Sequence, residues 1–196
     1  DLKDLFSGTI NAIMDALDSK DSYTLGRSRR VAFYTTKIIA AMDISKSEKA
    51  AIELAALLHD IGMIGVQEEI LHKVEKLTPE EREEIRKHVF YSVKILEDIK
   101  QLERVTEIIK YHHEFYNGEG YPFGKSGDEI PLGARIIAIA DAYDSLVSFR
   151  PYRDGLTPED ALERLKEQKG KQFDPKLFEI FESVVDDANK EWDKLN

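Results

Sequence analysis

Residues 52–62 read IELAALLHDIG, a run of apolar residues at helical spacing that ends in a His-Asp pair before a glycine. Ile52 and Ala56 fall on one face of the predicted helix, and His59 continues that face toward the core. Asp60 follows directly, and a carboxylate there is costly to bury unless it is paired, hydrogen-bonded or bound to a metal. Taken alone, the stretch favours a solvated helix end beside a satisfied core histidine.

The same helical spacing of apolar residues recurs along most of the chain, without a convincing alternating strand pattern. The predicted helices cover 2–18, a stretch ending near residue 42, 47–60, 78–97, 101–115 and 132–147, and two more begin at Thr157-Pro158 and Asp174-Pro175. Glycines and prolines concentrate in 117–131, which predicts an ordered loop. No linker or repeat divides the chain, so the sequence predicts an all-α helical bundle with a single domain over 1–196.

The composition narrows the possible ligands. The 196 residues are 42% hydrophobic, enough for one core, and carry a formal net charge of -10, which argues against binding a nucleic-acid polymer but not a small phosphorylated ligand. There is no cysteine, so a metal could bind only through imidazole and carboxylate, which suits iron, manganese or zinc-like ions. No apolar run reaches the roughly 18 residues of a membrane span, so a cytoplasmic location without membrane contact by this segment is expected.

A second aspartate lies in unusually apolar surroundings. Asp141 falls within the almost wholly apolar stretch 132–147, which predicts a helix buried nearly all round. A purely solvated carboxylate is unexpected there. Asp141 therefore either pairs with Arg135 or Arg150, or binds a metal.

Further histidines stand in apolar helical segments. His112 and His113 are adjacent, so on a helix their rings point about 100° apart and converge on one ion only if the helix end faces a cavity. His88 is ambiguous by itself. Taken together with the two aspartates and His59, these side chains predict a hydrolytic metal centre of one or two divalent ions, one to activate water and a second to clamp phosphate oxygens.

Two stretches carry a family resemblance. HDIG at 59–62 resembles the defining dyad of the HD superfamily of metal-dependent phosphohydrolases, and HHEFYNGEGYP at 112–122 resembles the HD-GYP motif of bacterial cyclic di-GMP phosphodiesterases. The similarity covers roughly residues 20–185 and includes RPYR at 150–153. The resemblance implies an all-α bundle of HD type with an ordered GYP loop.

The resemblance also implies roles for individual residues. The implied metal ligands are His59, Asp60 (the bridging and catalytic carboxylate), His88, His112, His113 and Asp141, and the implied substrate-binding residues are Gly120, Tyr121, Pro122, Arg150 and Arg153. The implied reaction is attack of metal-activated water on a phosphodiester of a cyclic dinucleotide, giving a linear dinucleotide or GMP. The metals and the arginines would supply local positive charge in an acidic protein.

A role in signal transduction follows from the same resemblance, because such domains often lie behind a sensory or receiver domain. The chain opens on Asp1, without a methionine, inside a predicted helix. We therefore expect a piece of a longer protein, in which residues 1–20 form a helix that connects to an upstream domain. By family analogy this helix could also pair two copies into a homodimer.

The chain departs from the family pattern at four positions. Arg27 stands where a histidine ligand is usual, and a guanidinium cannot coordinate a metal because it stays protonated. Met63 stands where a lysine usually helps to hold the scissile phosphate. Asn117 replaces an aspartate before the Gly-x-Gly-Tyr-Pro turn and can keep the turn geometry. Tyr23, in place of a glutamate, leaves a third ion unsupported.

These departures predict one intact and one damaged metal position. The damaged position keeps His59, Asp60 and Asp141, and the intact one has Asp60, His88, His112 and His113. Arg27 could occupy the damaged position by pairing with Asp60 or Asp141. Alternatively, water replaces the missing ligand and a two-metal centre still forms.

The predicted function is a metal-dependent cyclic-dinucleotide (cyclic di-GMP) phosphodiesterase domain of reduced or altered activity. The alternative is a catalytically degenerate cyclic-dinucleotide receptor or protein-interaction module, which Arg27 and Met63 together favour. A third possibility is a phosphohydrolase in which the missing lysine admits a different nucleotide.

Overall fold

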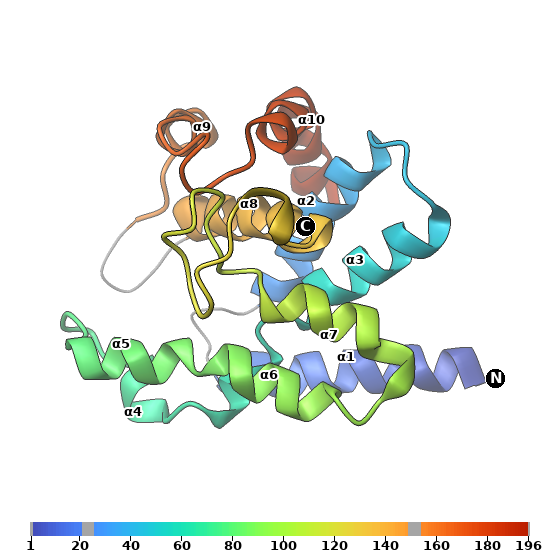
Figure 1. The fold of residues 1–196 in the computed structure, drawn as a ribbon, viewed down its shortest axis with the longest axis vertical. Helices are drawn as coiled ribbons and strands as arrows, with labels where there is room; N and C mark the ends of the chain where they lie inside the picture. Colours follow the sequence, from blue (N-terminus) through green and yellow to red (C-terminus); the bar gives the residue numbers. More distant parts are fainter. Residues whose placement is uncertain (1, 21–25, 149–153, 196) are drawn as a thin grey trace.

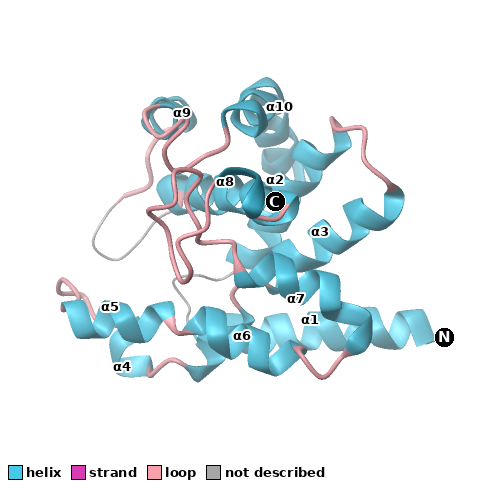
Figure 2. Ribbon diagram, viewed as in Figure 1, coloured by secondary structure: helices cyan, strands magenta, loops and turns pink. Residues whose placement is uncertain are grey.

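The computed structural model describes residues 2–20, 26–148 and 154–195, and helices and loops account for nearly all of these ranges (Figures 1 and 2). The α-helices are α1 (Leu2–Lys20), α2 (Arg27–Ala40), α3 (Lys46–Leu58), α4 (Glu68–Leu71), α5 (Pro79–Arg86), α6 (His88–Leu96), α7 (Glu103–Lys110), α8 (Leu132–Val147), α9 (Pro158–Lys166) and α10 (Pro175–Leu195), with 3-10 helices η2 (Ile61–Gly65), η3 (Lys100–Leu102) and η4 (Gly127–Glu129). Within those ranges there is no strand, only an isolated bridge between Lys169 and Phe173. The prediction of an all-α fold is confirmed.

The core forms around α8. This helix packs against α2, α3, α7, α9 and α10, so it lies in the middle of the bundle (Figure 1). Its Ile136, Ile137 and Ile139 are fully buried, as the uninterrupted apolar run predicts. Burying each such side chain contributes about 1.5–3 kcal/mol, which makes α8 a rigid support for any polar group that it carries. None of the described helices is long and apolar enough to cross a bilayer.

A second layer, made of α1, α4, α5 and α6, lies below α3 and α7 in Figure 1. The segment η2 joins the two layers, because it follows α3 and packs on α6 and α1. Gly62 permits the close approach to α6, since a Cβ there would lie 2.0 Å from the carbonyl oxygen of His88. The Gly62 N–H donates to Ser92 Oγ at 2.9 Å, and Ser92 Oγ donates to the His59 carbonyl at 3.3 Å. The turn after the His-Asp pair is thereby fixed on α6.

Two predicted helix boundaries are wrong, and one kind of contact explains both. The helix predicted over 78–97 is two helices that meet at Lys87, and the helix predicted over 101–115 ends at Lys110. Near each end, a histidine ring turns back onto the carbonyl three residues earlier and takes an acceptor that the helical ladder would use. The Nδ1–oxygen distances are 2.7 Å from His88 to Ile85 and 2.6 Å from His112 to Ile109.

The predicted capping signals otherwise hold. Thr78 and Glu81 form the expected capping box, with the Thr78 hydroxyl accepting from the Glu81 N–H and the Glu81 carboxylate accepting from the Thr78 N–H. The helix predicted over 47–60 runs over Lys46–Leu58, and Ser45 caps its start by accepting from the Glu48 N–H. The helices η2 and α4 were not predicted. Tyr23, named above as a departure from the family pattern, lies outside the described residues.

Candidate metal centre

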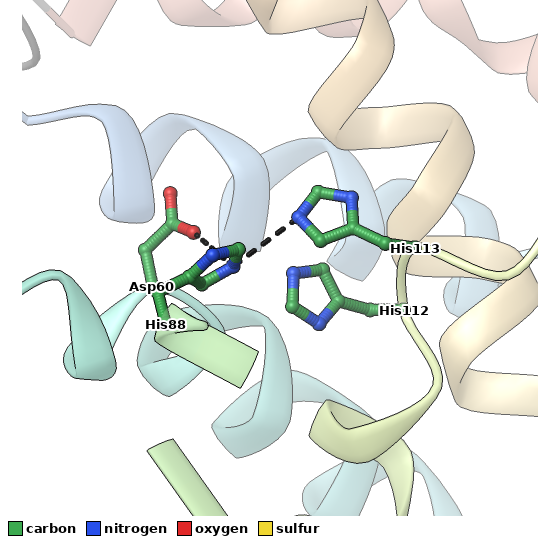
Figure 3. A group of neighbouring side chains, drawn as sticks. All are labelled: Asp60, His88, His112 and His113. Atoms are coloured by element: carbon green, nitrogen blue, oxygen red, sulfur yellow. Dashed lines mark hydrogen bonds and ion pairs between the residues drawn. The ribbon is translucent and has the colours of Figure 1, made fainter. Parts of the chain in front are cut away.

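Donor side chains from separate helix ends meet at one point. Asp60 follows α3, His88 begins α6, and His112 and His113 follow α7. Figure 3 shows these four side chains facing one another, and a ligand atom of each lies within 4.8 Å of those of the others. His88 Nε2 lies 3.5 Å from Asp60 Oδ1 and 3.2 Å from His113 Nε2. These residues are called the four-donor group below.

A second group shares Asp60 with the first. His59, Asp60 and Asp141 also place ligand atoms within 4.8 Å of one another, and they form the three-donor group. His59 Nε2 lies 3.2 Å from Asp60 Oδ2 and 3.4 Å from Asp141 Oδ1. Asp60 thus turns Oδ1 to the four-donor group and Oδ2 to the three-donor group. The structure brings together all six residues that the sequence predicted as ligands, in the predicted division.

The backbone orients the histidine rings. His59 Nδ1 lies 2.7 Å from the Ala56 carbonyl, which repeats the contact described for His88 and His112. A neutral ring that donates from Nδ1 carries its lone pair on Nε2 and presents it to the cluster. Nε2 of His112 is buried without a hydrogen-bond partner among the described residues, which is rare for a buried polar atom. Such a nitrogen beside a shared carboxylate fits a divalent transition-metal ion.

The four-donor group is prepared for a metal by its protonation state. Burial, together with the neighbouring His59 and His88, lowers the pKa of His112 to about 3. Burial likewise lowers the pKa of His88 and of His113 below the ordinary value. These rings are therefore neutral near pH 7, which is the form that binds a metal.

The three-donor group has the opposite electrostatics. Burial alone would lower the pKa of His59, but Asp60 and Asp141 outweigh it and raise that pKa to about 10. Burial would raise the pKa of both aspartates, yet His59 and Arg27 hold it well below the usual range. Both carboxylates are therefore charged and His59 holds a proton, which a metal at this position would have to displace.

Arg27 lies within the three-donor group. Its Nη2 donates to Asp141 Oδ1 at 2.5 Å and its Nε to Asp60 Oδ2 at 3.3 Å, the same two oxygens that face His59. Its Nη1 lies 3.8 Å from Asp144. Burial opposes the charge on Arg27, but Asp141 and Asp60 raise the pKa of the guanidinium, so it stays positive. The predicted pairing of Arg27 with Asp60 or Asp141 is confirmed for both.

The alternative pairing of Asp141 with Arg135 is wrong. Arg135 faces the other way along α8, where its Nη1 lies 2.7 Å from Asp128 and 2.8 Å from Asp174. The other suggested partner, Arg150, lies outside the described residues. Among the described residues, Asp141 is therefore paired by Arg27 and His59 alone.

The Gly-Tyr-Pro loop is ordered, as predicted, and buried Glu114 anchors it. The Glu114 carboxylate accepts from the Phe123 N–H at 2.7 Å and from the Lys125 N–H at 3.1 Å. The Tyr121 N–H donates to the His113 carbonyl at 3.1 Å, and the Tyr121 ring stacks on the His113 ring with centroids 4.8 Å apart. The loop therefore holds a metal-facing histidine from one side.

Local geometry also explains which residues occupy two further positions of the loop, Gly120 and Asn117. At Gly120 a Cβ would lie 2.2 Å from the Phe115 backbone nitrogen, so only glycine fits. The Asn117 Oδ1 accepts from the Glu119 N–H at 3.0 Å, an Asx turn. The prediction that Asn117 keeps the turn geometry is confirmed.

Replacing Glu114 by alanine should loosen this loop. The change leaves the N–H groups of Phe123 and Lys125 without their charged acceptor and should lower the free energy of unfolding by about 3 kcal/mol. Urea denaturation measures the loss, and hydrogen exchange should show faster exchange at these two amides. Glu107→Ala, an exposed carboxylate on α7, is the matched control and should leave both quantities unchanged. Unchanged exchange in Glu114→Ala would show that the loop does not depend on this anchor.

A cavity of about 620 Å³ opens on the centre, within the range of small-molecule sites. Its walls include Arg27, Asp60, His88, His113 and Tyr121, and also Met63, Leu17 and Asp18, with Ser28, Ile70, Leu71, Lys73, Val74, Glu75, Lys76, Leu77, Arg82 and Ile85 completing the lining. Met63 thus presents a thioether to the cavity, beside Asp60. Gly120 and Pro122 are not among its described lining residues. The predicted substrate-binding residues Arg150 and Arg153 lie outside the described residues.

Three acidic residues near the centre were not predicted. Asp144 is fully buried one helical turn beyond Asp141, and its Oδ1 accepts from Arg30 Nε at 2.5 Å. Its spacing from Asp141 on an apolar helix was a usable signal. Glu114 directly follows the paired histidines, and Asp18 lies at the cavity wall. Asp18 continues the four-residue spacing of Ile10 and Met14, which was a usable signal as well.

The fold and the site define an all-α domain whose helix ends gather imidazoles and a shared carboxylate that could hold a metal ion. A family model described as "HD domain" matches residues 11–177. The chain belongs to this HD-domain family and, by its histidine pair and Gly-Tyr-Pro loop, to the HD-GYP type.

Curated relatives and a solved structure agree with this assignment. The chain is 37% identical over 182 residues to 3'3'-cGAMP-specific phosphodiesterase 2 of Vibrio cholerae, covering 92% of this chain and 35% of the relative. It is 37% identical over 164 residues to a cyclic di-GMP phosphodiesterase of Thermotoga maritima, covering 83% and 45%. A crystal structure of a cyclic GMP-AMP specific phosphodiesterase of V. cholerae has a similar fold, with a TM-score of 0.70, 20% identity, and 91% of this chain and 48% of that chain covered. The chain spans less than half the length of these proteins.

Proposed function

We propose that this chain is a metal-dependent phosphodiesterase domain for a cyclic dinucleotide, with one ion in the four-donor group and Arg27 as the cation of the three-donor group. The proposal rests on the Asp60 carboxylate, whose two oxygens face different donor groups. One carboxylate oxygen faces His88 and the other faces Arg27 and His59, so a single residue links both positions. The names of the relatives, which are phosphodiesterases of cyclic di-GMP and 3'3'-cGAMP, support a cyclic dinucleotide as substrate.

The ion would polarise phosphate oxygens and lower the pKa of a bound water. The rest of the work falls to the protein. Arg27 lies at the cavity wall beside Asp60, where its charge can stabilise the negative charge that develops on a phosphate oxygen. Tyr121 also lines the cavity, and burial raises the pKa of its phenol, so it stays protonated and can donate a hydrogen bond. Met63 offers neither charge nor donor, which supports reduced or altered activity.

Metal analysis combined with a turnover assay tests this proposal. Purified protein should hold about one Mn or Fe per chain and should hydrolyse cyclic di-GMP to a linear dinucleotide or GMP. EDTA should stop turnover, and added Mn should restore it. Turnover that persists in EDTA would contradict the proposed role of the four-donor group.

A second candidate function is a receptor that binds a cyclic dinucleotide without cleaving it. Arg27 and Met63 favour it, because together they remove a ligand and a phosphate-holding cation. Tight binding of cyclic di-GMP with no turnover in Mn, Fe or Zn would establish the receptor and exclude the enzyme. An upstream sensory or receiver domain, a cytoplasmic location and a homodimer formed through residues 1–20 stay predictions, of which light scattering of the purified chain tests the last.

A further inference from the structure

The last turn of α1 places a carboxylate on the cavity wall. Ile10, Met14 and Asp18 share one face of α1 at four-residue spacing, and the first two are buried in the core. Asp18 is only 8% exposed and lines the same cavity as Asp60 and Tyr121. The apolar stripe of α1 therefore ends in a buried acid that faces the cavity.

Asp18 has no hydrogen-bonding or charged partner among the described residues. Arg29, which pairs with the same helix, is engaged by Asp15 at 2.8 Å. Asp18 also lies near the C-terminal end of α1 (Leu2–Lys20), where the unpaired carbonyls of the helix disfavour a negative charge. The Asp18 oxygens are not among the fully buried side-chain atoms that lack a partner, so they remain accessible at the cavity, where a ligand can supply the donors.

The other walls limit what this ligand can be. Residues 70–77 add a mostly apolar surface, which suits a flat ring. Lys76 and Arg82 line the cavity too, and neither forms an ion pair with a described residue, so they can face an anionic group. A ligand that fits is flat, carries N–H donors at one edge and is attached to a phosphate.

A metal ion at Asp18 is disfavoured by the donor count. The described groups of His, Asp and Glu that could hold an ion do not include Asp18. A single carboxylate does not make a divalent-metal site in a protein. Organic N–H donors are the remaining partners.

We propose that Asp18 binds the N1–H and N2 amine of a guanine base, and so selects guanine-containing cyclic dinucleotides. A carboxylate accepts two parallel hydrogen bonds, and guanine presents two adjacent donors at this edge. Adenine presents an acceptor at N1, which a carboxylate repels. This inference rests on the proposed function, because it assigns the base subsite of that same cavity.

Calorimetric titration of the whole chain in EDTA, where turnover is prevented, tests the assignment. Cyclic di-IMP is the informative probe, since hypoxanthine differs from guanine only by lacking the N2 amine. The wild type should bind cyclic di-GMP at least about tenfold more tightly than cyclic di-IMP. Its preference for cyclic di-GMP over cyclic di-AMP should be larger still. In Asp18→Asn the preference over cyclic di-IMP should fall to about one, whereas the control Asp15→Asn on the same helix should keep it.

The outcomes separate this inference from the proposed function. If Asp18→Asn keeps a tenfold preference for guanine over hypoxanthine, the role of Asp18 is wrong and the proposed function stands. If the wild type binds none of the three dinucleotides in EDTA, the assignment of Asp18 is overturned, whereas the proposed function is decided separately by turnover of cyclic di-GMP with added Mn. The melting temperature of Asp18→Asn should stay unchanged or rise, because an uncompensated charge is removed; a fall of several degrees would reveal a structural role and overturn the assignment.

Discussion

Replacing Asp60 by alanine should abolish hydrolysis of cyclic di-GMP, lowering kcat/KM at least about a thousandfold. The reason is that Asp60 contributes to both donor groups through separate oxygens. Without it, the four-donor group keeps only neutral imidazoles, and Arg27 loses one of its two close carboxylates. Steady-state kinetics with added Mn, and the metal content of the purified variant, measure both consequences.

Two variants control for the loss. Asp98→Ala removes an exposed carboxylate at the far end of α6 and should leave turnover and metal content unchanged. Asp60→Asn keeps the shape of the side chain but not its charge, so it should resemble Asp60→Ala in kinetics. If Asp60→Ala retained metal and turned over at a rate near that of the wild type, the centre would lie elsewhere.

The double change Arg27→His and Met63→Lys should raise both metal content and activity. The histidine restores a fourth donor beside His59, Asp60 and Asp141, and the lysine restores a cation at the cavity. Metal content should rise from about one ion per chain toward two, and kcat/KM should rise at least about tenfold. Metal analysis and initial-rate kinetics check the two expectations separately.

The single change Arg27→His should also alter the folding free energy, which can be measured without an activity assay. Without the guanidinium, two buried carboxylates face each other with only His59 between them, so in EDTA the variant should lose about 3–5 kcal/mol of folding free energy. Added Mn should recover most of that loss, making the melting temperature depend on metal concentration far more than in the wild type. Arg27→Lys keeps the charge and should lose less. If neither stability nor activity of Arg27→His responds to Mn, the account of the damaged position is wrong.

The pattern of apolar residues predicted most of the helices and drew attention to the buried polar residues, and the resemblance to the HD-GYP motif implied all six clustered donors. Asp141 illustrates why: a carboxylate on a helix that is otherwise apolar has to find a partner, and the sequence alone exposes that need. The sequence around Asp141 does not indicate which residue this partner is. Arg135 is six residues from Asp141 and points away, whereas Arg27, 114 residues distant, makes the 2.5 Å contact.

Two helix ends and the place of Asp18 at the cavity were not predicted from the sequence, for related reasons. The ends of α5 and α7 depend on a histidine side chain that contacts a backbone carbonyl oxygen in place of the next helical N–H. The spacing of apolar residues does not reveal such a contact. Asp18 continues the face of Ile10 and Met14, but only the packing of α1 shows that this face ends at the cavity. In both cases the decisive contact is tertiary or involves a single ring, and the spacing of apolar residues does not reveal it.

Because Arg27 lies among the carboxylates of the three-donor group, the positive charge of that group does not depend on the surrounding solution as the charge of a bound ion does. Bound ions exchange with the medium, can be removed by chelators and, for iron, change oxidation state. The charge of Arg27 is covalently attached, does not exchange and has no redox chemistry. The positive charge that Arg27 brings to the three-donor group is therefore encoded in the gene, and only the charge of an ion in the four-donor group would vary with the supply of metal.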